Sequence, residues 1–195
     1  MTKIEKLLIS KQKVFTVDDL AILWNMPNRK KLWESIKYYL RSNRLQKIYS
    51  GVYVLADHEF DQLELAVNLF TPSYISFFTA LAVHGVNFQH YSQVHAMALA
   101  SKTIKTQGLS FVYHQLKDEI FFNETGVEQR VTYKIASIER AICDSLYLVP
   151  SMTFDVLDAI NIDKLQQVAQ VYNNKSLLKK VQQIIRSIER INDAQ

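Results

Sequence analysis

Basic side chains gather in residues 28–55 with a spacing that suits contact with a nucleic-acid backbone. Asn28 can cap a helix. That helix carries five cations: Arg29, Lys30, Lys31, Lys37 and Arg41. Arg44 and Lys47 flank the first strand of a predicted hairpin, and Ser50 and Gly51 form its turn. A basic helix followed by a basic hairpin is typical of a winged helix-turn-helix, whose helix enters the major groove of DNA while the hairpin lies along the phosphates or an adjacent groove.

The predicted basic helix has one side that packs and one side that is free to bind. The packing side holds Leu32, Ile36, Tyr39 and Leu40, with Trp33 beside them. The opposite side holds Lys30, Lys31, Glu34, Ser35, Lys37, Tyr38 and Arg41. We expect four of these residues to read base edges, because the first half of such a helix usually meets the bases: Lys30, Lys31, Glu34 and Ser35. Lys37, Arg41, Arg44 and Lys47 are expected to hold phosphates. For each single residue, a solvated basic surface without a ligand is the alternative.

The aromatic residues of the hairpin allow two interpretations. Tyr49 can lie against the DNA backbone or pack on the helix, and with Ser50 it belongs to the candidate DNA contacts. For Tyr53 packing is favoured, because residues 52–54 have the pattern of an ordinary strand.

The other residues capable of chemistry do not form a recognisable catalytic or metal-binding pattern. The histidines are His58, His84, His90, His95 and His114, and no two of them lie four residues apart. Cys143 is the only cysteine, so a zinc site is not expected. Glu139 and Asp144 diverge around a predicted helix, and Glu139 with Arg140 is interpreted as a structural pair. With no glycine-rich phosphate loop and no nucleophile elbow, the sequence predicts neither an enzyme nor a cofactor.

The distribution of charge indicates a nucleic-acid-binding head on a neutral-to-acidic body. Residues 1–56 hold eleven basic and four acidic side chains, a net charge of +7, whereas residues 57–195 have a net charge of −3. The 195 residues are 48% hydrophobic, which is enough for one large or two small domains. Two domains packed closely together are predicted, at 1–56 and 57–195. No apolar run reaches the roughly 18 residues of a membrane span. Residues 1–10 have no signal-peptide core, so a cytoplasmic protein is expected.

The head is predicted to contain two further helices that support the basic one. The first covers roughly residues 2–11. The second begins after Thr16, which with Asp19 three residues later resembles a capping box. Pro27 ends the second helix. Three helices and a hairpin make this part of the chain a predicted winged helix-turn-helix.

The body is predicted to be a small mixed or antiparallel sheet covered by helices, so the whole chain is α+β with a helical C-terminal end. Strands are predicted at residues 94–99, 109–113, 120–122 and 127–135. Helices are predicted at residues 60–70, 74–84, 138–148, 153–160, 162–172 and 175–191. The last helix carries an apolar stripe from Leu177 to Ile191. We interpret it as packing on its own domain, with a dimer or partner contact as the alternative.

Three segments in order resemble a known family. Phe15 to Ala21, with the hairpin Leu45 to Tyr53, resembles the winged helix of the AbiEi-like transcriptional regulators, the antitoxins of AbiE-type (type IV) toxin–antitoxin systems of abortive infection. Pro72 to Gly85 resembles the segment that opens the family's second domain. Ile135 to Asp144 resembles a later helix, in which Ile138 replaces the usual proline. The resemblance covers residues 14–150.

The resemblance implies a repressor that binds inverted repeats in the double-stranded DNA of its own promoter. It also implies a partner gene for a nucleotidyltransferase-like toxin, antagonised through the C-terminal domain without a required stable complex. Two other functions remain open from the residues alone: a protein–protein interaction module, and a solitary transcription factor with no toxin partner.

Overall fold

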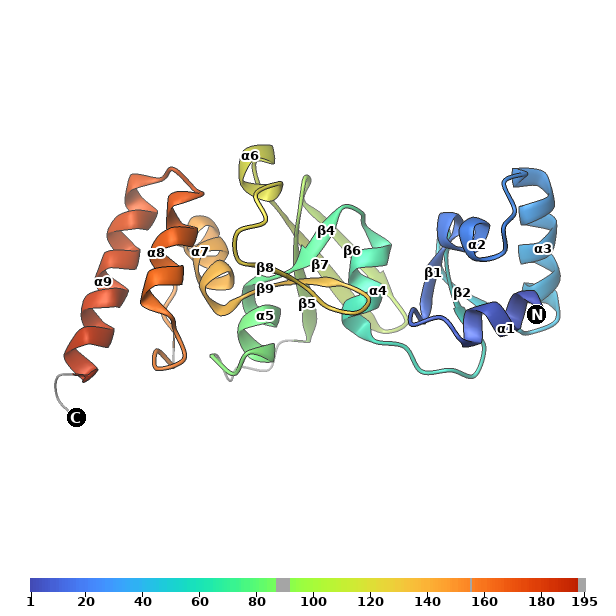
Figure 1. Ribbon diagram of the computed structural model, residues 1–195, viewed down its shortest axis with the longest axis horizontal. Coiled ribbons are helices and arrows are strands. Elements are labelled where there is room, and N and C mark those ends of the chain that lie inside the picture. Colours follow the sequence, from blue (N-terminus) through green and yellow to red (C-terminus); the bar gives the residue numbers. More distant parts are fainter. Residues whose placement is uncertain (87–91, 155, 193–195) are drawn as a thin grey trace.

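Hydrophobic residues form two clusters in the computed structural model, which describes residues 1–86, 92–154 and 156–192 (side chains only to 190). The smaller cluster lies within residues 1–55, and the larger one fills the body. The described residues form a mixed α+β fold with a three-stranded and a six-stranded sheet. The molecule is elongated, with the N-terminal elements at one end and the C-terminal helices at the other (Figure 1).

The N-terminal unit, here called the head, contains three helices and one sheet. Its elements are α1 (Lys3–Leu8), β1 (Val14–Thr16), α2 (Val17–Leu23), α3 (Arg29–Arg41), β2 (Leu45–Tyr49) and β3 (Val52–Leu55). The strands lie in the order β1-β3-β2, and both neighbouring pairs are antiparallel. The predicted capping box is confirmed, because Thr16 Oγ1 accepts a hydrogen bond from the Asp19 backbone N–H and Asp19 accepts one from that of Thr16. The first helix is shorter than predicted and ends at Leu8.

The central strand of the head sheet, β3, is buried on both faces. Phe15 and Tyr53 lie opposite each other on β1 and β3, and both belong to the head cluster with Leu32 and Ile36 of α3. The alternate residues of these strands, Val14, Val52 and Val54, belong to the body cluster instead. Since successive side chains of a strand point to opposite faces, the sheet packs on the helices of the head with one face and on the body with the other. The two predicted domains therefore share a layer of strands.

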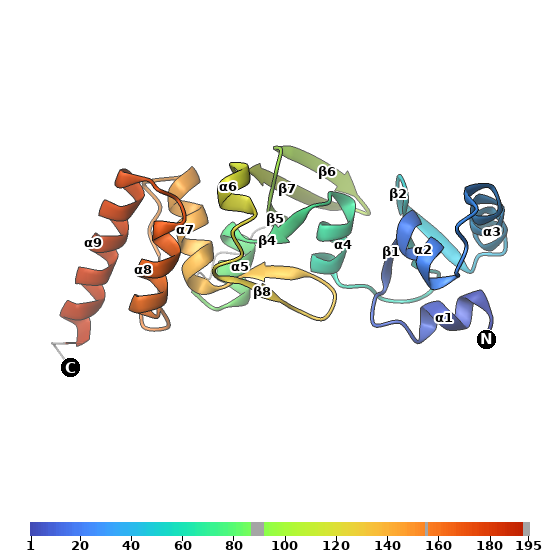
Figure 2. The same ribbon diagram turned by 45° about the horizontal axis from the view of Figure 1, so that its top comes forward.

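The remainder, here called the body, is built around the six-stranded sheet. Its strands are β4 (Ser73–Ile75), β5 (Gln93–Ala98), β6 (Lys102–Thr106), β7 (Leu109–Gln115), β8 (Val127–Gln129) and β9 (Lys134–Ala136), in the order β6-β7-β5-β4-β9-β8. The pairs β5–β7 and β4–β9 are parallel and the other pairs antiparallel, which confirms a mixed sheet. Its helices are α4 (Gln62–Leu69), α5 (Phe77–Val83), α6 (Asp118–Phe121), α7 (Ile138–Leu148), α8 (Ile162–Gln170) and α9 (Lys175–Asn192). The last three stack side by side at the end away from the head (Figures 1 and 2).

Four predicted elements of the body are wrong or incomplete, and one strand was missed. The expected strand at 120–122 falls in α6 and its end. Tyr74 and Ile75, expected at the start of a helix, belong to β4. The expected strand at 127–135 is a hairpin of two short strands, and β6 was not expected at all. Residues 153–160 form no helix in the described part, which excludes Asp155. Short apolar runs do not distinguish strand from helix, and β6 carries polar residues at most positions.

A buried ionic network explains why α7 is rich in polar residues. Arg140 and Asp144 have no exposed side-chain surface, and their Nε and Oδ1 atoms lie 3.5 Å apart. Tyr74, Ser76 and Tyr172 all donate hydroxyl hydrogen bonds to the Asp144 carboxylate, at distances down to 2.5 Å. Burial raises the pKa of Asp144 above its usual range, although Arg140 and these hydroxyls act in the opposite direction. The network joins α7 to β4 and to the end of α8.

Single residues of α7 and α9 differ in how well their sequence pattern predicted their contacts. The expected Glu139–Arg140 pair is wrong, because Glu139 Oε2 lies 3.3 Å from Lys164 Nζ while Arg140 pairs with Asp144. Four apolar residues of α9 are buried: Leu177, Val181, Ile185 and Ile188. They pack against the rest of the body, as expected; the Ile191 side chain lies outside the described part. Cys143 is buried, and burial raises the pKa of its thiol.

Two histidines meet across neighbouring strands. His95 on β5 and His114 on β7 stack with their rings 6° from parallel, and Nδ1 of His95 lies 2.9 Å from Nε2 of His114. Burial, followed by the nearby His114, lowers the pKa of His95 to about 4. Helical spacing cannot reveal such a pair, because the two residues meet through strand pairing. His90 lies outside the described residues. None of the described helices is long and apolar enough to cross a membrane.

Candidate nucleic-acid interface

The helix α3 forms the outer end of the molecule, farthest from the body (Figures 1 and 2). It begins after Asn28, whose Oδ1 accepts a hydrogen bond from the Lys31 backbone N–H at 3.1 Å, as the sequence predicted. Leu32 and Ile36 fix the helix on the head cluster with no exposed surface. It ends where Asn43 adopts a left-handed φ of 51°. The outer side of the helix is therefore held rigidly and faces solvent.

One stripe of charged side chains runs along this outer side. Lys30, Glu34, Lys37 and Arg41 recur at three- and four-residue intervals, so they share one face of the helix. All four are exposed. Among the described residues, no acidic side chain forms an ion pair with Lys30, Lys37 or Arg41. Their charges are thus available to an external anion.

Two further residue pairs flank the stripe. Lys31 and Tyr38 lie beside α1, and Tyr38 is 64% exposed. On the other flank, Trp33 is 42% exposed, although its position next to the packing side suggested more burial. Arg29 lies near α2, where its Nη2 atom is 2.6 Å from Oδ1 of Asp18. Because Asp18 offsets its charge, Arg29 is a weaker candidate for phosphate contact than the stripe cations.

Ser35 does not lie on the stripe. Its side chain is half-buried against α1, where Lys3 Nζ donates a hydrogen bond to Ser35 Oγ at 2.7 Å. The Ser35 hydroxyl in turn donates to the Lys31 carbonyl oxygen at 3.1 Å. A base-reading role for Ser35 would require both partners to be exchanged. The contact with Lys3 depends on how α1 packs, which the spacing within α3 does not reveal.

The hairpin β2–β3 presents its two cations to solvent but not its aromatic residue. Arg44 and Lys47 are exposed. Tyr49 is half-buried and packs against the body cluster, so the structure does not bring it to the outer face of α3. Tyr53 is buried in the head cluster, as expected.

The end of the hairpin is attached to its surroundings on two sides. Ser50 is exposed in the turn, and the next residue, Gly51, accepts a hydrogen bond from the Val17 backbone N–H at 3.1 Å. Thr106 of β6 donates a hydroxyl hydrogen bond to the Ile48 carbonyl oxygen at 2.6 Å. The hairpin is therefore a fixed part of the junction between head and body, and not a free arm.

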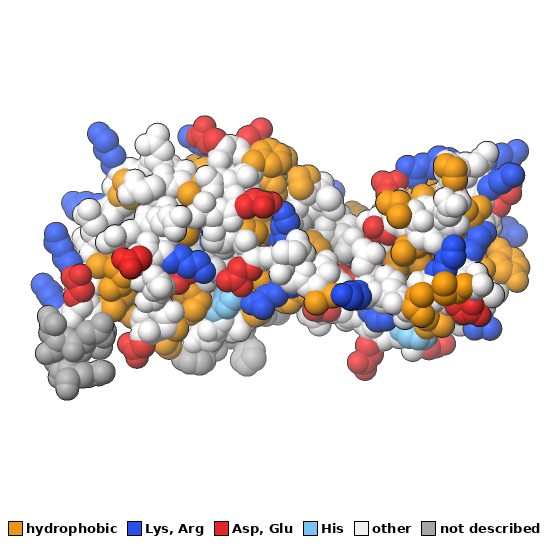
Figure 3. Space-filling model, viewed as in Figure 1, with side chains coloured by type: hydrophobic (Ala, Val, Ile, Leu, Met, Phe, Trp, Pro, Cys, Tyr) orange, Lys and Arg blue, Asp and Glu red, His pale blue; other side chains and the backbone are white. Residues whose placement is uncertain are grey.

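Positive charge is concentrated at both ends of the molecule. Figure 3 shows Lys and Arg side chains over the head and along α9, with acidic side chains between them. Residues 175–192 hold five basic side chains and one acidic one, whereas residues 57–174 hold seven basic and thirteen acidic, a net charge of −6. Without α9 the body is therefore more acidic than its total net charge of −3, because α9 adds a net positive charge.

The outer face of α3 combines exposed cations, two exposed aromatic residues and one carboxylate on a rigid helix. Such a surface can neutralise phosphates and place side chains against base edges. The described residues contain no group of three or more His, Cys, Asp or Glu side chains placed to hold a metal ion. No protein-family model matches the chain, and no curated protein matches it.

Proposed function

We propose that this protein is a DNA-binding transcriptional regulator whose residues 1–56 act as a winged helix-turn-helix. The observation that carries the proposal is the exposed stripe of unpaired cations on α3. The element order of the head supports it, because a three-helix unit followed by a two-stranded hairpin is how winged helices are built. In this proposal α3 enters the major groove, and Arg44 and Lys47 contact the phosphates beside it.

The motif resemblance extends the proposal to a particular kind of regulator. The protein acts in the cytoplasm as the antitoxin and autorepressor of an AbiE-type operon, and it binds inverted repeats in its own promoter. Its functional partner is a nucleotidyltransferase-like toxin, with which it needs no stable complex. The protein–protein interaction alternative loses its main support, because four apolar residues of α9 are buried against the body: Leu177, Val181, Ile185 and Ile188.

The experiment is a titration of the full chain with a fluorescent duplex taken from the region upstream of its gene. A random duplex of equal length is the control for specificity. Affinity for the upstream duplex should exceed that for the random one and should fall steeply with salt, because each phosphate contact contributes about 0.9 to the log–log slope. Equal affinity for both duplexes would contradict a specific regulator.

Variants of α3 distinguish the residues proposed to hold phosphates from those proposed to contact base edges. Lys37→Ala or Arg41→Ala should weaken binding to every duplex and reduce the salt slope by about 1 each. Lys30→Ala or Lys31→Ala should change the preferred sequence. Lys117→Ala, an exposed cation of the body, is the matched control and should leave both quantities unchanged.

The regulator and antitoxin parts of the proposal are tested separately. Co-expression with the product of the adjacent gene should relieve growth arrest if that product is a toxin of the proposed kind. Specific DNA binding without any such relief would leave a solitary transcription factor.

A further inference from the structure

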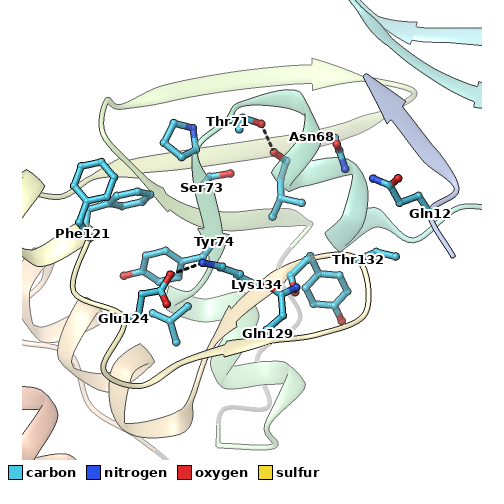
Figure 4. Close-up of a pocket in the computed structure, with 15 residues that line it drawn as sticks. Gln12, Asn68, Thr71, Ser73, Tyr74, Phe121, Glu124, Gln129, Thr132 and Lys134 are labelled. Carbon is cyan, nitrogen blue, oxygen red and sulfur yellow. Dashed lines mark hydrogen bonds and ion pairs between the residues drawn. The ribbon is translucent and has the colours of Figure 1, made fainter. Parts of the chain in front are cut away.

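A cavity of about 380 Å³ lies at the junction of head and body. Its walls come from the loop before β1, the end of α4, β4, the segment after α6, and the β8–β9 hairpin. Figure 4 shows Gln12, Asn68 and Thr132 at one end of the cavity, and Phe121 and Glu124 at the other. Its volume falls within the range of sites that hold small molecules.

The wall formed by residues 120–125 is fixed from behind. Arg140 donates hydrogen bonds to the backbone carbonyl oxygens of Ile120, Asn123 and Thr125, at 2.8 to 3.1 Å. The opposite end is fixed by Glu64, whose Oε1 accepts hydrogen bonds from the backbone N–H groups of residues 13 and 14 at 2.7 and 2.9 Å. The cavity is therefore preformed, which lowers the entropic cost of binding.

Aromatic side chains give the cavity flat apolar surfaces. Phe121 and Tyr74 are buried at its base, with ring centroids 5.6 Å apart. Phe122 lines the cavity while 63% exposed, and its ring meets the edge of Phe121 with 5.3 Å between centroids, so one of its faces is free for a ligand. Tyr133 lines the hairpin side. A planar ligand can stack on such rings.

The polar side chains that line the cavity carry no net charge. Gln12, Asn68 and Gln129 contribute amides, which offer both donors and acceptors. Among the described residues, no hydrogen bond engages the Gln12 side chain or Oδ1 of Asn68. The two charged side chains at the cavity, Glu124 and Lys134, form an ion pair with each other. An added phosphate would meet the carboxylate as well as the ammonium group.

We propose that this cavity binds a neutral, planar nitrogen heterocycle of nucleoside size. The base would stack on Phe122 at one end of the cavity, and the sugar hydroxyls would exchange hydrogen bonds with the amides of Gln12 and Asn68 at the other end. Because Gln12 belongs to the head and Asn68 to the body, the ligand would bridge the two units. The proposal does not depend on DNA binding.

The test is isothermal titration calorimetry of the full chain with adenosine, guanosine, cytidine and uridine, each added separately and without DNA. At least one nucleoside should bind at concentrations up to about 5 mM, near the weak end of measurable affinities. Phe122→Ala should weaken that binding at least about fivefold, because stacking of a base on an aromatic ring is lost. Gln12→Ala should weaken it by about two- to tenfold, as expected for one hydrogen bond.

Val131→Ala is the matched control, since Val131 is 74% exposed on the same hairpin and does not line the cavity. It should bind like the unmodified chain. Absence of heat with all four nucleosides would overturn the proposal, as would unchanged binding by Phe122→Ala. Tighter binding of the 5′-monophosphates than of the nucleosides would show that the ligand is anionic, and would overturn its neutral character. Thermal unfolding of each variant without ligand should match that of the unmodified chain, so a loss of affinity reports the cavity itself.

Discussion

Replacing Arg140 by methionine would leave the Asp144 carboxylate buried without its cation. The guanidinium group makes five hydrogen bonds of 3.2 Å or less, two to the Tyr74 hydroxyl and three to backbone carbonyl oxygens. Methionine has a similar length and no donor, so the volume is retained while every one of these bonds is lost. Removing one partner of a buried ion pair costs about 3–5 kcal/mol, and we expect the free energy of unfolding to fall by that amount.

The assay is urea unfolding followed by circular dichroism at pH 7.5. Arg130→Met is the matched control, because Arg130 pairs with Glu128 while about half exposed, and such surface pairs contribute less than about 1 kcal/mol. The double variant Arg140→Met/Asp144→Leu should be more stable than Arg140→Met alone, because it removes the unpaired charge.

The pH dependence adds a second readout for Arg140→Met. Burial raises the pKa of Asp144, and Arg140 is the largest opposing influence, so removing Arg140 should raise that pKa further. A folded-state carboxyl with a raised pKa binds protons more readily than the unfolded chain, so stability is lost as the pH rises. The destabilisation by Arg140→Met should therefore be smaller at pH 5 than at pH 7.5. A loss below about 1 kcal/mol at pH 7.5, or no change with pH, would refute the role assigned to the network.

Three further outcomes are expected. Because burial lowers the pKa of His95 to about 4, the unfolded chain binds more protons below pH 6.5. Stability should therefore fall by about 1.4 kcal/mol per pH unit between pH 6.5 and 4, and His95→Gln should flatten this slope in urea unfolding. Gly126→Ala should lower the melting temperature more than Gly108→Ala, because both glycines have a left-handed φ but only at Gly126 would a Cβ lie 2.9 Å from another side-chain carbon. Glu64→Ala should lower the free energy of unfolding by about 2 kcal/mol and speed hydrogen exchange of the amides at residues 13 and 14, which donate to the Glu64 carboxylate. Unchanged exchange of these amides would contradict the role of Glu64 in fixing this segment to the body.

Local signals in the sequence predicted the helices of the head well. The Thr16 capping box and the Asn28 cap each depend on residues no more than three positions apart, so the chain needs no tertiary information to specify them. The exposed stripe with Lys37 and Arg41 follows from the same helical period that buries Leu32 and Ile36. These features are encoded within single turns of helix.

Features that depend on packing between distant segments could not be predicted in the same way. Ser35 is half-buried, unlike the exposed residues of the stripe, and Lys3 of α1 donates a hydrogen bond to its hydroxyl. Tyr49 faces the body because the sheet of the head is covered on its second face. The pairing of His95 with His114 depends on the register of two parallel strands, which periodicity does not specify.

The shared sheet also limits how the chain can be divided. A fragment ending at residue 56 would keep all the proposed DNA contacts, yet it would expose Val14, Ile48, Val52 and Val54, which are now almost fully buried. A row of branched apolar side chains on a bare sheet favours self-association. The isolated fragment should therefore aggregate, and exchange of this head between proteins would require a body with a matching surface. Position 56 is a boundary in sequence, but the unit that folds cooperatively extends across it.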